Sequence, residues 1–380
     1  MKKIFLVLSL YLLGACETAP SNPTLTIRVQ TPSLEEGETV YITGSDSSLG
    51  LWEADKVALL QLDNGDWQFK HAYPESTVLE FKLTRGSWNN EAVYDGKTIP
   101  GNLKVRVLRD TTLEVSVHTW RDQISIDVIE NPEDIVGDVR YHHNIVPEGL
   151  LERTVRVWLP PGYDSETQRY PVLYMHDGQN IFSPAFSFNH EEWRVDEVAD
   201  SLIRANHISP IIVVGVDNTG DRSIEYSTTK KGKMYLRFLT EQLKPMIDET
   251  YRTLPDRENT AVMGSSMGGL ISFLAIWHHS DVFSVAGCLS PAFIYKGVNS
   301  VTQVSNYSGN KKPMRLYIDN GGEGLEKKLQ PGCDAMLSAL KEIGYDESEV
   351  FWKLYPKALH TEKAWAERLH EPLLFMFGQN

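Results

Sequence analysis

The sequence is poor in cysteine and in net positive charge, and it shows no spacing typical of a metal site. Only three cysteines occur in 380 residues, and none is spaced as metal ligands are. The formal net charge of −14 argues against nucleic acid as a partner and against adhesion to anionic lipid. Cys288 lies in an apolar run and is expected to be a buried thiol. The sequence therefore implies neither a metal nor an organic cofactor.

The first residues have the features of a targeting segment. Two lysines precede an apolar stretch, residues 4–13, which is too short to span a bilayer and fits a secretory signal. Leu13-Gly14-Ala15-Cys16 then resembles the end of a bacterial lipoprotein signal, in which the cysteine becomes the lipidated first residue. We predict a signal peptide over residues 1–16 and a polar tether over residues 17–23. A plain signal peptide cut near Ala15 is the alternative.

A lipid anchor on Cys16 would make the membrane a partner and would place the protein in the bacterial cell envelope. Glu17, rather than an aspartate, follows Cys16. By analogy with lipoproteins, this residue favours sorting to the outer membrane. The sequence does not distinguish the periplasmic face from the outer face.

The segment 24–121 has the pattern of a small all-β domain. Short stretches alternate apolar and polar side chains, as strands with one buried face do. Turn residues such as Asn64-Gly65 and Arg85-Gly86 separate them. Several short strands at this spacing predict a β-sandwich, followed by a linker over residues 122–139. The strand candidates are residues 24–29, 39–43, 67–70, 78–83 and 113–117.

The same segment resembles a starch-binding-type carbohydrate-binding module. The resemblance rests on Leu49-Gly50-Leu51-Trp52 and on residues 81–88, which end in Trp88. In such modules, tryptophans at the positions of Trp52 and Trp88 stack on sugar rings, because a flat aromatic face fits the apolar face of a sugar. The sequence departs from the family where Gly101-Asn102-Leu103-Lys104 replaces the usual Asn-Arg pair. Two interpretations stay open: glycan binding, or a role as a spacer or docking domain.

From residue 140 to residue 380 the pattern changes to strands that alternate with helices. Several strand candidates are apolar throughout, as strands buried on both faces are. Such alternation predicts a mostly parallel sheet with helices on both faces. The strand candidates are residues 154–159, 171–175, 211–216, 260–263, 285–289, 315–318 and 351–354. The helix candidates are residues 192–204, 234–251, 269–279, 334–343 and 362–377.

A turn of small residues joins strand candidate 260–263 to the helix candidate that follows it. The turn reads Gly264-Ser265-Ser266-Met267-Gly268, a strand–nucleophile–helix pattern centred on Ser266. Glycines two residues before and after the serine let strand and helix approach without a Cβ clash. The N–H of Met267 would then point to where an oxyanion forms. Ser265 is excluded as the centre, because its frame would need glycine at Met263.

Further stretches occur in a fixed order around this turn. They are residues 157–163, residues 170–180, residues 213–218 followed by Arg222, and His360 before Trp365. In this order they closely resemble the putative esterase family of α/β-hydrolases, which contains esterase D-like, feruloyl and siderophore esterases. The resemblance covers residues 154–378. It implies an α/β-hydrolase fold, an oxyanion loop, and a triad in the chain order serine, acid, histidine.

The oxyanion donors and the base can be assigned within this framework. The hydrolase sheet needs a donor from the loop after its third strand, where His176-Asp177-Gly178-Gln179-Asn180 lies. We assign Gly178 or Gln179 as the donor besides Met267, since glycine lets the backbone turn its N–H inward. His360 follows the last strand candidate, so it fits the base that takes the Ser266 proton. His176 is more typical of a residue that holds the loop than of a base.

The sequence leaves the acid of the triad open. It should follow strand candidate 315–318, on a loop that runs from Asp319 to Glu326. The common family spacing falls on Gly324, so the sequence departs from the family here. Glu326 is favoured, and Glu323 and Asp319 are the alternatives. The acid would hold the tautomer of the base and stabilise its imidazolium form.

These residues predict a serine carboxylic-ester hydrolase that works through an acyl-enzyme. A sugar-binding-like module beside the hydrolase suggests an acyl ester of a carbohydrate, feruloyl or acetyl, or a related small ester. A siderophore trilactone is the alternative substrate, and it would predict cationic side chains around the site. A glycan-binding surface lipoprotein with an inactive hydrolase scaffold is the alternative from another class of function. Transfer of the acyl group to an acceptor other than water also stays open.

Overall fold

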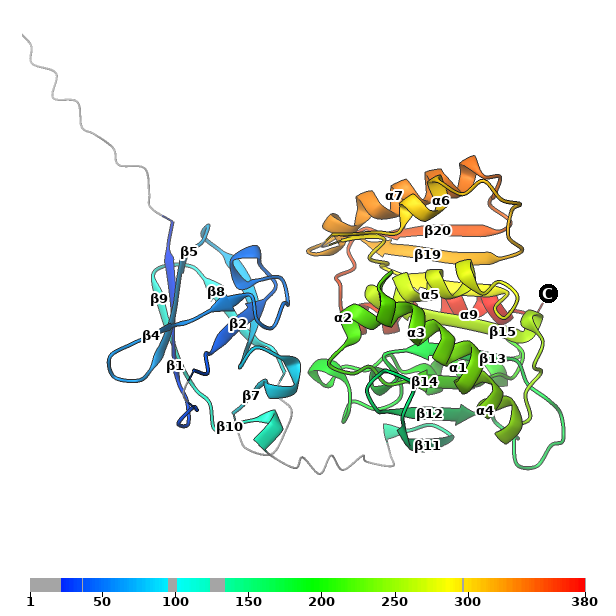
Figure 1. Cartoon of the computed structure of the whole chain (residues 1–380), viewed down its shortest axis with the longest axis horizontal. Coiled ribbons are helices and arrows are strands. Elements are labelled where there is room, and N and C mark those ends of the chain that lie inside the picture. The colour runs from blue at the N-terminus through cyan, green and yellow to red at the C-terminus, as the bar shows by residue number, and fades with distance from the viewer. Residues whose placement is uncertain (1–21, 36, 95–100, 124–133, 296, 380) are drawn as a thin grey trace, which may run out of the picture.

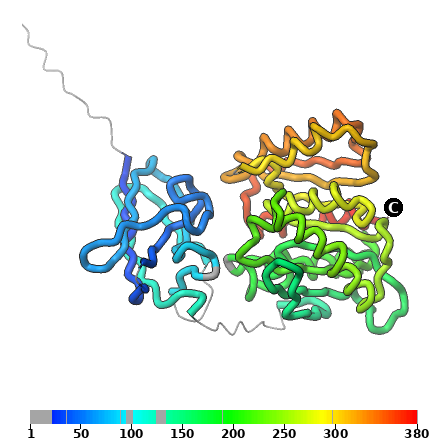
Figure 2. Tube along the Cα trace, in the orientation of Figure 1, coloured from blue at the N-terminus to red at the C-terminus, as the bar shows by residue number. Residues whose placement is uncertain are grey.

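Two bodies of different architecture follow one another along the chain (Figure 1 and Figure 2). The computed structural model describes residues 22–35, 37–94, 101–123, 134–295 and 297–379. The predicted signal peptide, Cys16 and most of the tether lie outside these residues, and so does the middle of the predicted linker. Within the described ranges, no helix combines the length and hydropathy that a membrane span requires.

The first domain is a β-sandwich of two four-stranded sheets, in the orders β4-β5-β1-β9 and β3-β2-β6-β8. Alternate residues of β1, Leu25, Ile27 and Val29, are fully buried between the sheets, as strands with one solvated face require. Strand β8 was missed in the sequence, because only its last residue is fully buried and the pattern is weak. The strands are β1 (Thr24–Gln30), β2 (Tyr41–Gly44), β3 (Val57–Ala58), β4 (Leu60–Gln61), β5 (Trp67–Ala72), β6 (Thr77–Thr84), β7 (Ala92–Val93), β8 (Leu103–Val107), β9 (Thr111–Ser116) and β10 (Thr119–Trp120).

The second domain is built on an eight-stranded sheet in the order β11-β12-β14-β13-β15-β16-β19-β20. The six strands from β14 to β20 run parallel, and β11 and β12 are antiparallel additions at one edge. Strand β11 begins at Asp138, so it includes the last two residues of the predicted linker. The strands are β11 (Asp138–Ile145), β12 (Arg153–Leu159), β13 (Val172–His176), β14 (Ile212–Val216), β15 (Thr260–Ser265), β16 (Val285–Leu289), β19 (Arg315–Gly321) and β20 (Val350–Tyr355).

Helices cover both faces of this sheet and give it two hydrophobic cores. One core lies under α3 (Lys230–Arg237), α4 (Lys244–Thr250), α5 (Met267–His278) and α7 (Glu326–Glu342). The other lies under α1 (Val195–Arg204), α8 (Glu362–Arg368) and α9 (His370–Phe377). Cys288 is fully buried in the first core as a free thiol. The mostly parallel sheet with helices on both faces is thus confirmed.

Three of the predicted helices differ from the structure by more than three residues or are divided. Predicted helix 234–251 is α3, a π-helical turn over Phe238–Leu243 and α4 in continuous succession. Predicted helix 362–377 divides at Leu369 into α8 and α9. Helix α7 begins eight residues earlier than predicted, at Glu326, and continues through Pro331. The early start of α7 matters for the site, because it places Glu326, a candidate acid, on the first turn of this helix.

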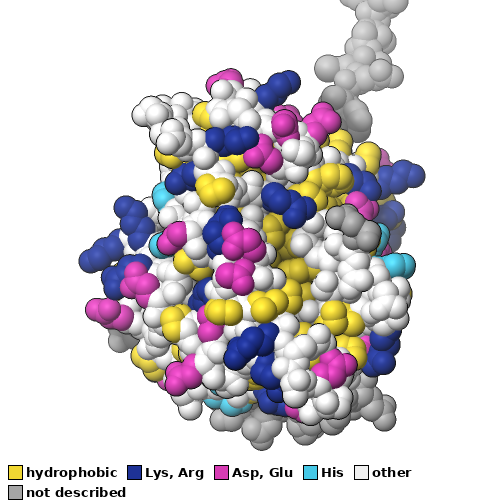
Figure 3. All heavy atoms as spheres, turned by 90° about the vertical axis from the view of Figure 1, so that its right-hand side faces the viewer, with side chains coloured by type: hydrophobic (Ala, Val, Ile, Leu, Met, Phe, Trp, Pro, Cys, Tyr) yellow, Lys and Arg dark blue, Asp and Glu magenta, His cyan; other side chains and the backbone are white. Residues whose placement is uncertain are grey.

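The parallel strands direct their carboxyl ends toward the first domain (Figure 1). In parallel α/β sheets, ligands bind at this edge, because the loops that follow the strands meet there. Figure 3 shows the opposite side of the second domain, where acidic and basic side chains are interspersed among apolar ones. The edge that faces the first domain is therefore where the predicted site residues are expected to meet.

Candidate active site

Ser266 occupies a strained turn between β15 and α5. Its backbone has φ of 58° and ψ of −120°, a combination that residues with a side chain rarely adopt. The hydrogen bonds around it hold this geometry: Ser266 N donates to Leu289 O at 2.9 Å, and Ala292 N donates to Ser266 O at 3.0 Å. The turn exposes the serine at the end of the sheet and opens helix α5 at Met267. A serine at a sharp strand-to-helix turn is the arrangement that nucleophilic catalysis requires.

The two glycines that flank the serine allow strand and helix to touch. A Cβ added to Gly264 would lie 2.8 Å from the carbonyl carbon of Gly268, which is closer than packed atoms allow. A Cβ on Gly268 would lie 3.2 Å from an oxygen of Asp177 in the neighbouring loop. The close approach expected from the sequence is therefore present at both positions.

The loop after β13 lies beside this turn and has the form of an oxyanion loop. A short 3-10 helix, Gly178–Asn180, begins it, and Asp177 before that helix has the left-handed φ of 57°. Gly178 is not among the glycines with a positive φ, so its backbone conformation alone does not require glycine. The reason is packing: a Cβ there would lie 2.5 Å from the carbonyl carbon of Gly215. Gln179 is fixed through its side chain, whose Oε1 accepts from Asn218 N at 3.1 Å.

Asp177 fixes the loop through charged hydrogen bonds. Its carboxylate accepts from Arg222 Nε at 2.6 Å, from Arg222 Nη2 at 2.8 Å and from Asn218 Nδ2 at 2.6 Å. Burial raises the pKa of Asp177, but Arg222 and Asn218 lower it more, so the pKa lies below its ordinary value. A bidentate pair of this kind gives the loop both strength and a defined orientation.

His176 is buried and lies away from the solvent. Its Nδ1 is 2.9 Å from the hydroxyl oxygen of Tyr235, and its ring packs against Tyr226 and Tyr235. Burial lowers the pKa of His176 to about 3, so the ring is neutral near pH 7. These contacts fit the interpretation of His176 as a residue that supports the loop.

His360 and Glu326 meet at the same edge of the sheet. His360 Nδ1 lies 3.4 Å from Glu326 Oε1, which is longer than an ordinary hydrogen bond and typical of a catalytic contact without substrate. The Glu326 side chain is fully buried, whereas the His360 side chain is 14% exposed. Burial raises the pKa of Glu326, but His360 and Ser290 lower it more. The carboxylate therefore stays ionised beside the imidazole.

A buried network that the sequence analysis missed holds Glu326. Ser290 Oγ donates to Glu326 Oε1 at 2.7 Å and itself accepts from Trp365 Nε1 at 3.0 Å and Arg368 Nη2 at 2.9 Å. Ser290 follows β16, whereas Trp365 and Arg368 belong to α8, so no local pattern links them. The only sequence signal was that Trp365 recurs after His360 in the resembled family.

The other two acid candidates lie elsewhere. Asp319 is fully buried in β19 and binds Arg368 through both oxygens, at 3.0 and 2.9 Å. Burial raises the pKa of Asp319 to about 6, although Arg368 opposes the rise. Glu323 is half exposed and pairs with Lys327 on the surface. The expected loop from Asp319 to Glu326 is shorter than predicted, since β19 continues to Gly321 and α7 starts at Glu326.

Trp52 and Trp88, the candidate sugar-stacking residues, both contact the second domain. Each lies with its ring 6.4 Å from the ring of Phe188 and nearly perpendicular to it. Phe188 belongs to the segment that follows the oxyanion loop. The structure thus brings the two tryptophans together on a protein side chain.

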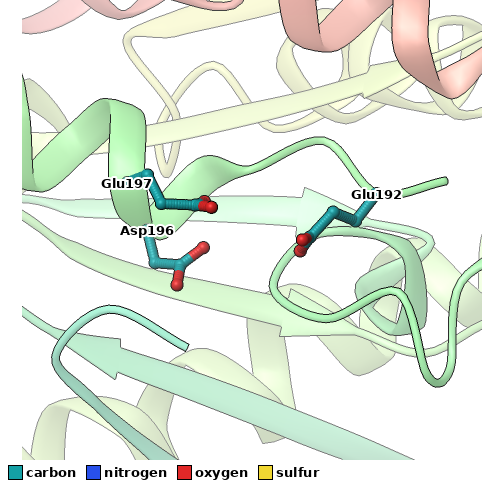
Figure 4. A group of neighbouring side chains, drawn as sticks. All are labelled: Glu192, Asp196 and Glu197. Carbon is teal, nitrogen blue, oxygen red and sulfur yellow. The ribbon is translucent and has the colours of Figure 1, made fainter. Parts of the chain in front are cut away.

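Three carboxylates converge at the start of α1 (Figure 4). Among the described histidine, cysteine and acidic residues, Glu192, Asp196 and Glu197 are the group whose ligand atoms lie within 4.8 Å of one another. They could supply part of an oxygen shell for a hard divalent cation. Glu192 and Glu197 also line a hollow of about 670 Å³ between α1 and α8, which none of Ser266, Glu326 and His360 lines.

Protein groups already relieve part of the charge of this acidic cluster. Arg194 Nε donates to Glu197 Oε1 at 3.0 Å, and Val136 N donates to Asp196 Oδ2 at 2.7 Å. Asp196 is fully buried, and burial together with Glu197 raises its pKa to about 8, against the backbone hydrogen bond from Val136 that lowers it. A proton held on Asp196 therefore accounts for the cluster near neutral pH.

We expect Asp196→Asn to stabilise the protein increasingly as the pH rises. Between the ordinary pKa of aspartate, near 4, and the raised value, the folded state holds a proton that the unfolded state has lost, so wild-type stability falls with pH. Asparagine keeps the acceptor for Val136 N and does not titrate. The Tm of the variant relative to wild type should rise by roughly 10 °C between pH 5 and pH 8. A difference that does not change with pH would contradict the raised pKa.

Comparisons with known proteins agree with this geometry. Residues 151–376 match the family described as Putative esterase, and residues 24–108 match the family described as Starch binding domain. An endo-1,4-beta-xylanase/feruloyl esterase of Xylanibacter ruminicola is 31% identical over 202 residues, which are 51% of this chain and 25% of that longer protein. The uncharacterised protein YbbA of Bacillus subtilis is 21% identical over 248 residues, 60% of this chain and 94% of its own.

Solved structures share the fold. A ferulic acid esterase superposes with a TM-score of 0.54 at 21% identity, over 63% of this chain and 97% of its own. The enterobactin esterase FES from Shigella flexneri, in the presence of enterobactin, gives a TM-score of 0.54 at 16% identity over 92% of both chains. The match to the esterase family alone covers more than half of the chain, and the starch-binding match precedes it. This chain therefore belongs to the Putative esterase family, as a carboxylic ester hydrolase with an α/β-hydrolase domain behind a starch-binding-type β-sandwich.

Proposed function

We propose that this protein hydrolyses carboxylic esters through an acyl-enzyme on Ser266. The observation that carries the proposal is the link, through the end of β16, between the strained Ser266 turn and the His360–Glu326 pair. Ser266 N donates to Leu289 O, and the adjacent Ser290 holds Glu326 beside His360. Ser266, Glu326 and His360 also occur in the chain order that α/β-hydrolases use.

His360 is the general base in this mechanism. Its neutral imidazole takes the proton of Ser266 Oγ while that oxygen attacks the carbonyl carbon of the ester. Glu326, ionised and held by Ser290, keeps the proton of the ring on the side away from the serine and stabilises the imidazolium. The imidazolium then gives its proton to the leaving alcohol. In the second half, His360 activates water, which releases the acid and restores the serine.

The negative charge that develops on the carbonyl oxygen needs donors in fixed positions. We assign these donors to the N–H of Met267 and the N–H of Gly178 or Gln179. Met267 is the first residue of α5, so the helix dipole adds to its effect. The loop that carries Gly178 and Gln179 is held by Arg222 and Asn218, so its donors do not need to reorganise during the reaction.

An acyl ester of a carbohydrate, such as a feruloyl or acetyl ester, is the substrate class that we favour. The similarity to a protein named as a xylanase and feruloyl esterase supports it. A siderophore trilactone would need free cationic side chains for its anionic groups. Three buried or partly buried arginines of this domain are instead committed to carboxylates: Arg156 to Asp217, Arg222 to Asp177 and Arg368 to Asp319.

A fluorophosphonate probe tests the chemistry, and a choice of esters tests the substrate. The probe should label the peptide that contains Ser266, and labelling should abolish hydrolysis of 4-nitrophenyl acetate. Labelling of another serine, or activity that survives complete labelling, would exclude the mechanism. Faster turnover of a synthetic trilactone than of methyl ferulate or an acetylated xylooligosaccharide would exclude the favoured substrate class.

We also propose that Cys16 carries the lipid that anchors the protein in the cell envelope, on the outer membrane. The proposal rests on the lipoprotein-like signal that ends at this cysteine. Metabolic labelling with a radioactive fatty acid should mark the wild-type protein, and Cys16→Ser should abolish the label. A labelled Cys16→Ser variant would contradict the anchor.

A further inference from the structure

Phe188 of the esterase domain lies between two tryptophans of the β-sandwich. Its ring centroid is 6.4 Å from those of Trp52 and Trp88, with interplanar angles of 87° and 88°. Perpendicular rings at this distance are a favourable edge-to-face arrangement. From here on, the aromatic junction means these three residues. Because both tryptophans meet one ring, the junction fixes the sandwich at a defined point of the esterase domain.

A lysine below the ring adds to the junction. Lys82 Nζ lies 4.9 Å from the centroid of Phe188, within the range in which an ammonium is attracted to an aromatic face. The Lys82 side chain is only 2% exposed, and it pairs with Glu91 at 2.8 Å. The buried ammonium of Lys82 against the face of Phe188 is therefore a further contact between the two domains at this point.

The loop that presents Trp52 has an unusual backbone. Leu51 and Trp52 have φ of 51° and 65°, a left-handed conformation that residues with side chains seldom adopt in succession. Trp52 N donates to Gly44 O at 3.1 Å, and Leu51 N donates to Asp46 O at 3.2 Å. Strain that the surrounding hydrogen bonds hold in place is typical of functional positions. The backbone at Trp52 is therefore held by hydrogen bonds within the sandwich.

Phe188 is tied in turn to the oxyanion loop. Phe188 N donates to Asn180 Oδ1 at 3.0 Å, and Ser187 Oγ donates to Gln179 O at 3.3 Å. Trp193 N donates to Asn180 O at 2.9 Å, so the segment is bound to the loop at both of its ends. A displacement of Phe188 would pull on the turn that carries the assigned oxyanion donors.

Charged groups of the loop that presents Trp52 also act on groups of the esterase domain. The pKa of Asp46 is lowered: burial raises it, while Ser48 and the charge of Lys328 lower it. Lys328 stands on α7, two residues after Glu326. Burial and, next, the charge of Glu53 raise the pKa of Tyr295 to about 12. The charges of Asp46 and Lys328 therefore act on one another across the two domains.

We infer that Trp52 and Trp88 are positioning residues for ester hydrolysis, which act through Phe188 on the oxyanion loop, and that they do not serve as a platform for sugar rings. The inference rests on the proposed function, because it takes Gly178 or Gln179 as the oxyanion donor. The starch-binding-type sandwich is then part of the catalytic unit. Its two family tryptophans contact Phe188 of its own chain, in the geometry described above.

Variants of the full chain test this inference with 4-nitrophenyl acetate, whose acyl group is too small to need the tryptophans. Trp52→Ala/Trp88→Ala and Phe188→Ala should each lower kcat about tenfold with little change in KM, because the oxyanion donors are displaced. Adding Phe188→Ala to the double variant should cost nothing further, since all three act through one contact. Phe188→Tyr should restore activity. Leu108→Ala, at a side chain 54% exposed on the same sandwich, is the matched control and should behave as wild type.

Each remaining outcome overturns the inference. One is a wild-type kcat in Trp52→Ala/Trp88→Ala together with lost binding to soluble starch, which would show that the tryptophans bind sugar. Another is a loss on bulky feruloyl esters alone, which would indicate substrate contact. A third is a fall in activity that matches the fall in sites labelled by the fluorophosphonate, which would indicate lost folding only. Full activity of a Ser266→Ala variant would instead reject the proposed function, whatever the junction variants do.

Discussion

Replacing Ser266 by alanine is expected to lower kcat for 4-nitrophenyl acetate by a factor on the order of 10⁶. The substitution removes the oxygen that forms the acyl-enzyme, whereas the oxyanion donors and the fold stay in place. The residual rate above that of water comes from those donors alone. Circular dichroism and the Tm should match wild type, because the turn depends on backbone hydrogen bonds to Leu289 and Ala292 rather than on the hydroxyl.

Ser265 gives a control that differs by a single position. It is the last residue of β15 and only 4% exposed, so its hydroxyl does not present a nucleophile to a substrate. Ser265→Ala should keep kcat within a few-fold of wild type. Loss of activity in Ser265→Ala with activity retained in Ser266→Ala would move the nucleophile by one residue and reject the assignment.

The fold and the serine turn could be predicted because local patterns specify them. Continuous apolar strands that alternate with helices specify a parallel sheet, and the turn needs glycine at Gly264 and Gly268 for steric reasons that hold in any context. The antiparallel edge strand β11 was not among the strand candidates, since its residues are half or fully exposed and no apolar pattern marks them. The packing role of the glycine in the oxyanion loop could not be predicted, because its neighbour Gly215 lies in another strand.

The acid could not be selected from the sequence for a similar reason. Asp319, Glu323 and Glu326 lie within eight positions of one another, and their environments differ only in three dimensions. Arg368, from a helix near the C-terminus, neutralises Asp319, and Ser290 from another strand end holds Glu326. In addition, Pro331 obscured the early start of α7, which places Glu326 on the first turn of a helix. Contacts between distant segments therefore determine which of the three carboxylates lies beside His360.

The contact of Trp52 and Trp88 with Phe188 was equally hidden. A tryptophan that stacks on sugar and a tryptophan that docks on another domain have the same local sequence, and both remain partly exposed on the isolated sandwich. Phe188 has no pattern that marks it, since it lies in a short 3-10 turn without periodicity. Its importance comes from Asn180, whose side chain joins it to the oxyanion loop.

Glu326→Gln is expected to lower kcat about 10⁴-fold and to leave KM nearly unchanged. Glutamine has nearly the same shape but carries no charge, so it neither stabilises the imidazolium of His360 nor enforces the correct tautomer. In the wild type, Ser290 Oγ donates to the Glu326 carboxylate at 2.7 Å, and in the variant it meets an amide instead. Steady-state kinetics, normalised to the sites that a fluorophosphonate labels in a long incubation, measure the effect on chemistry rather than on folding.

The two rejected carboxylates provide the comparison that makes this result specific. Glu323→Gln should behave as wild type, because Glu323 only pairs with Lys327 on the surface and such pairs contribute less than about 1 kcal/mol. Asp319→Asn should lower the free energy of unfolding by about 3–5 kcal/mol, since it leaves Arg368 buried without its partner. Its folded fraction should still turn over far faster than Glu326→Gln. If Asp319→Asn instead lost activity 10⁴-fold per labelled site while Glu326→Gln stayed active, Asp319 would have to replace Glu326 as the acid.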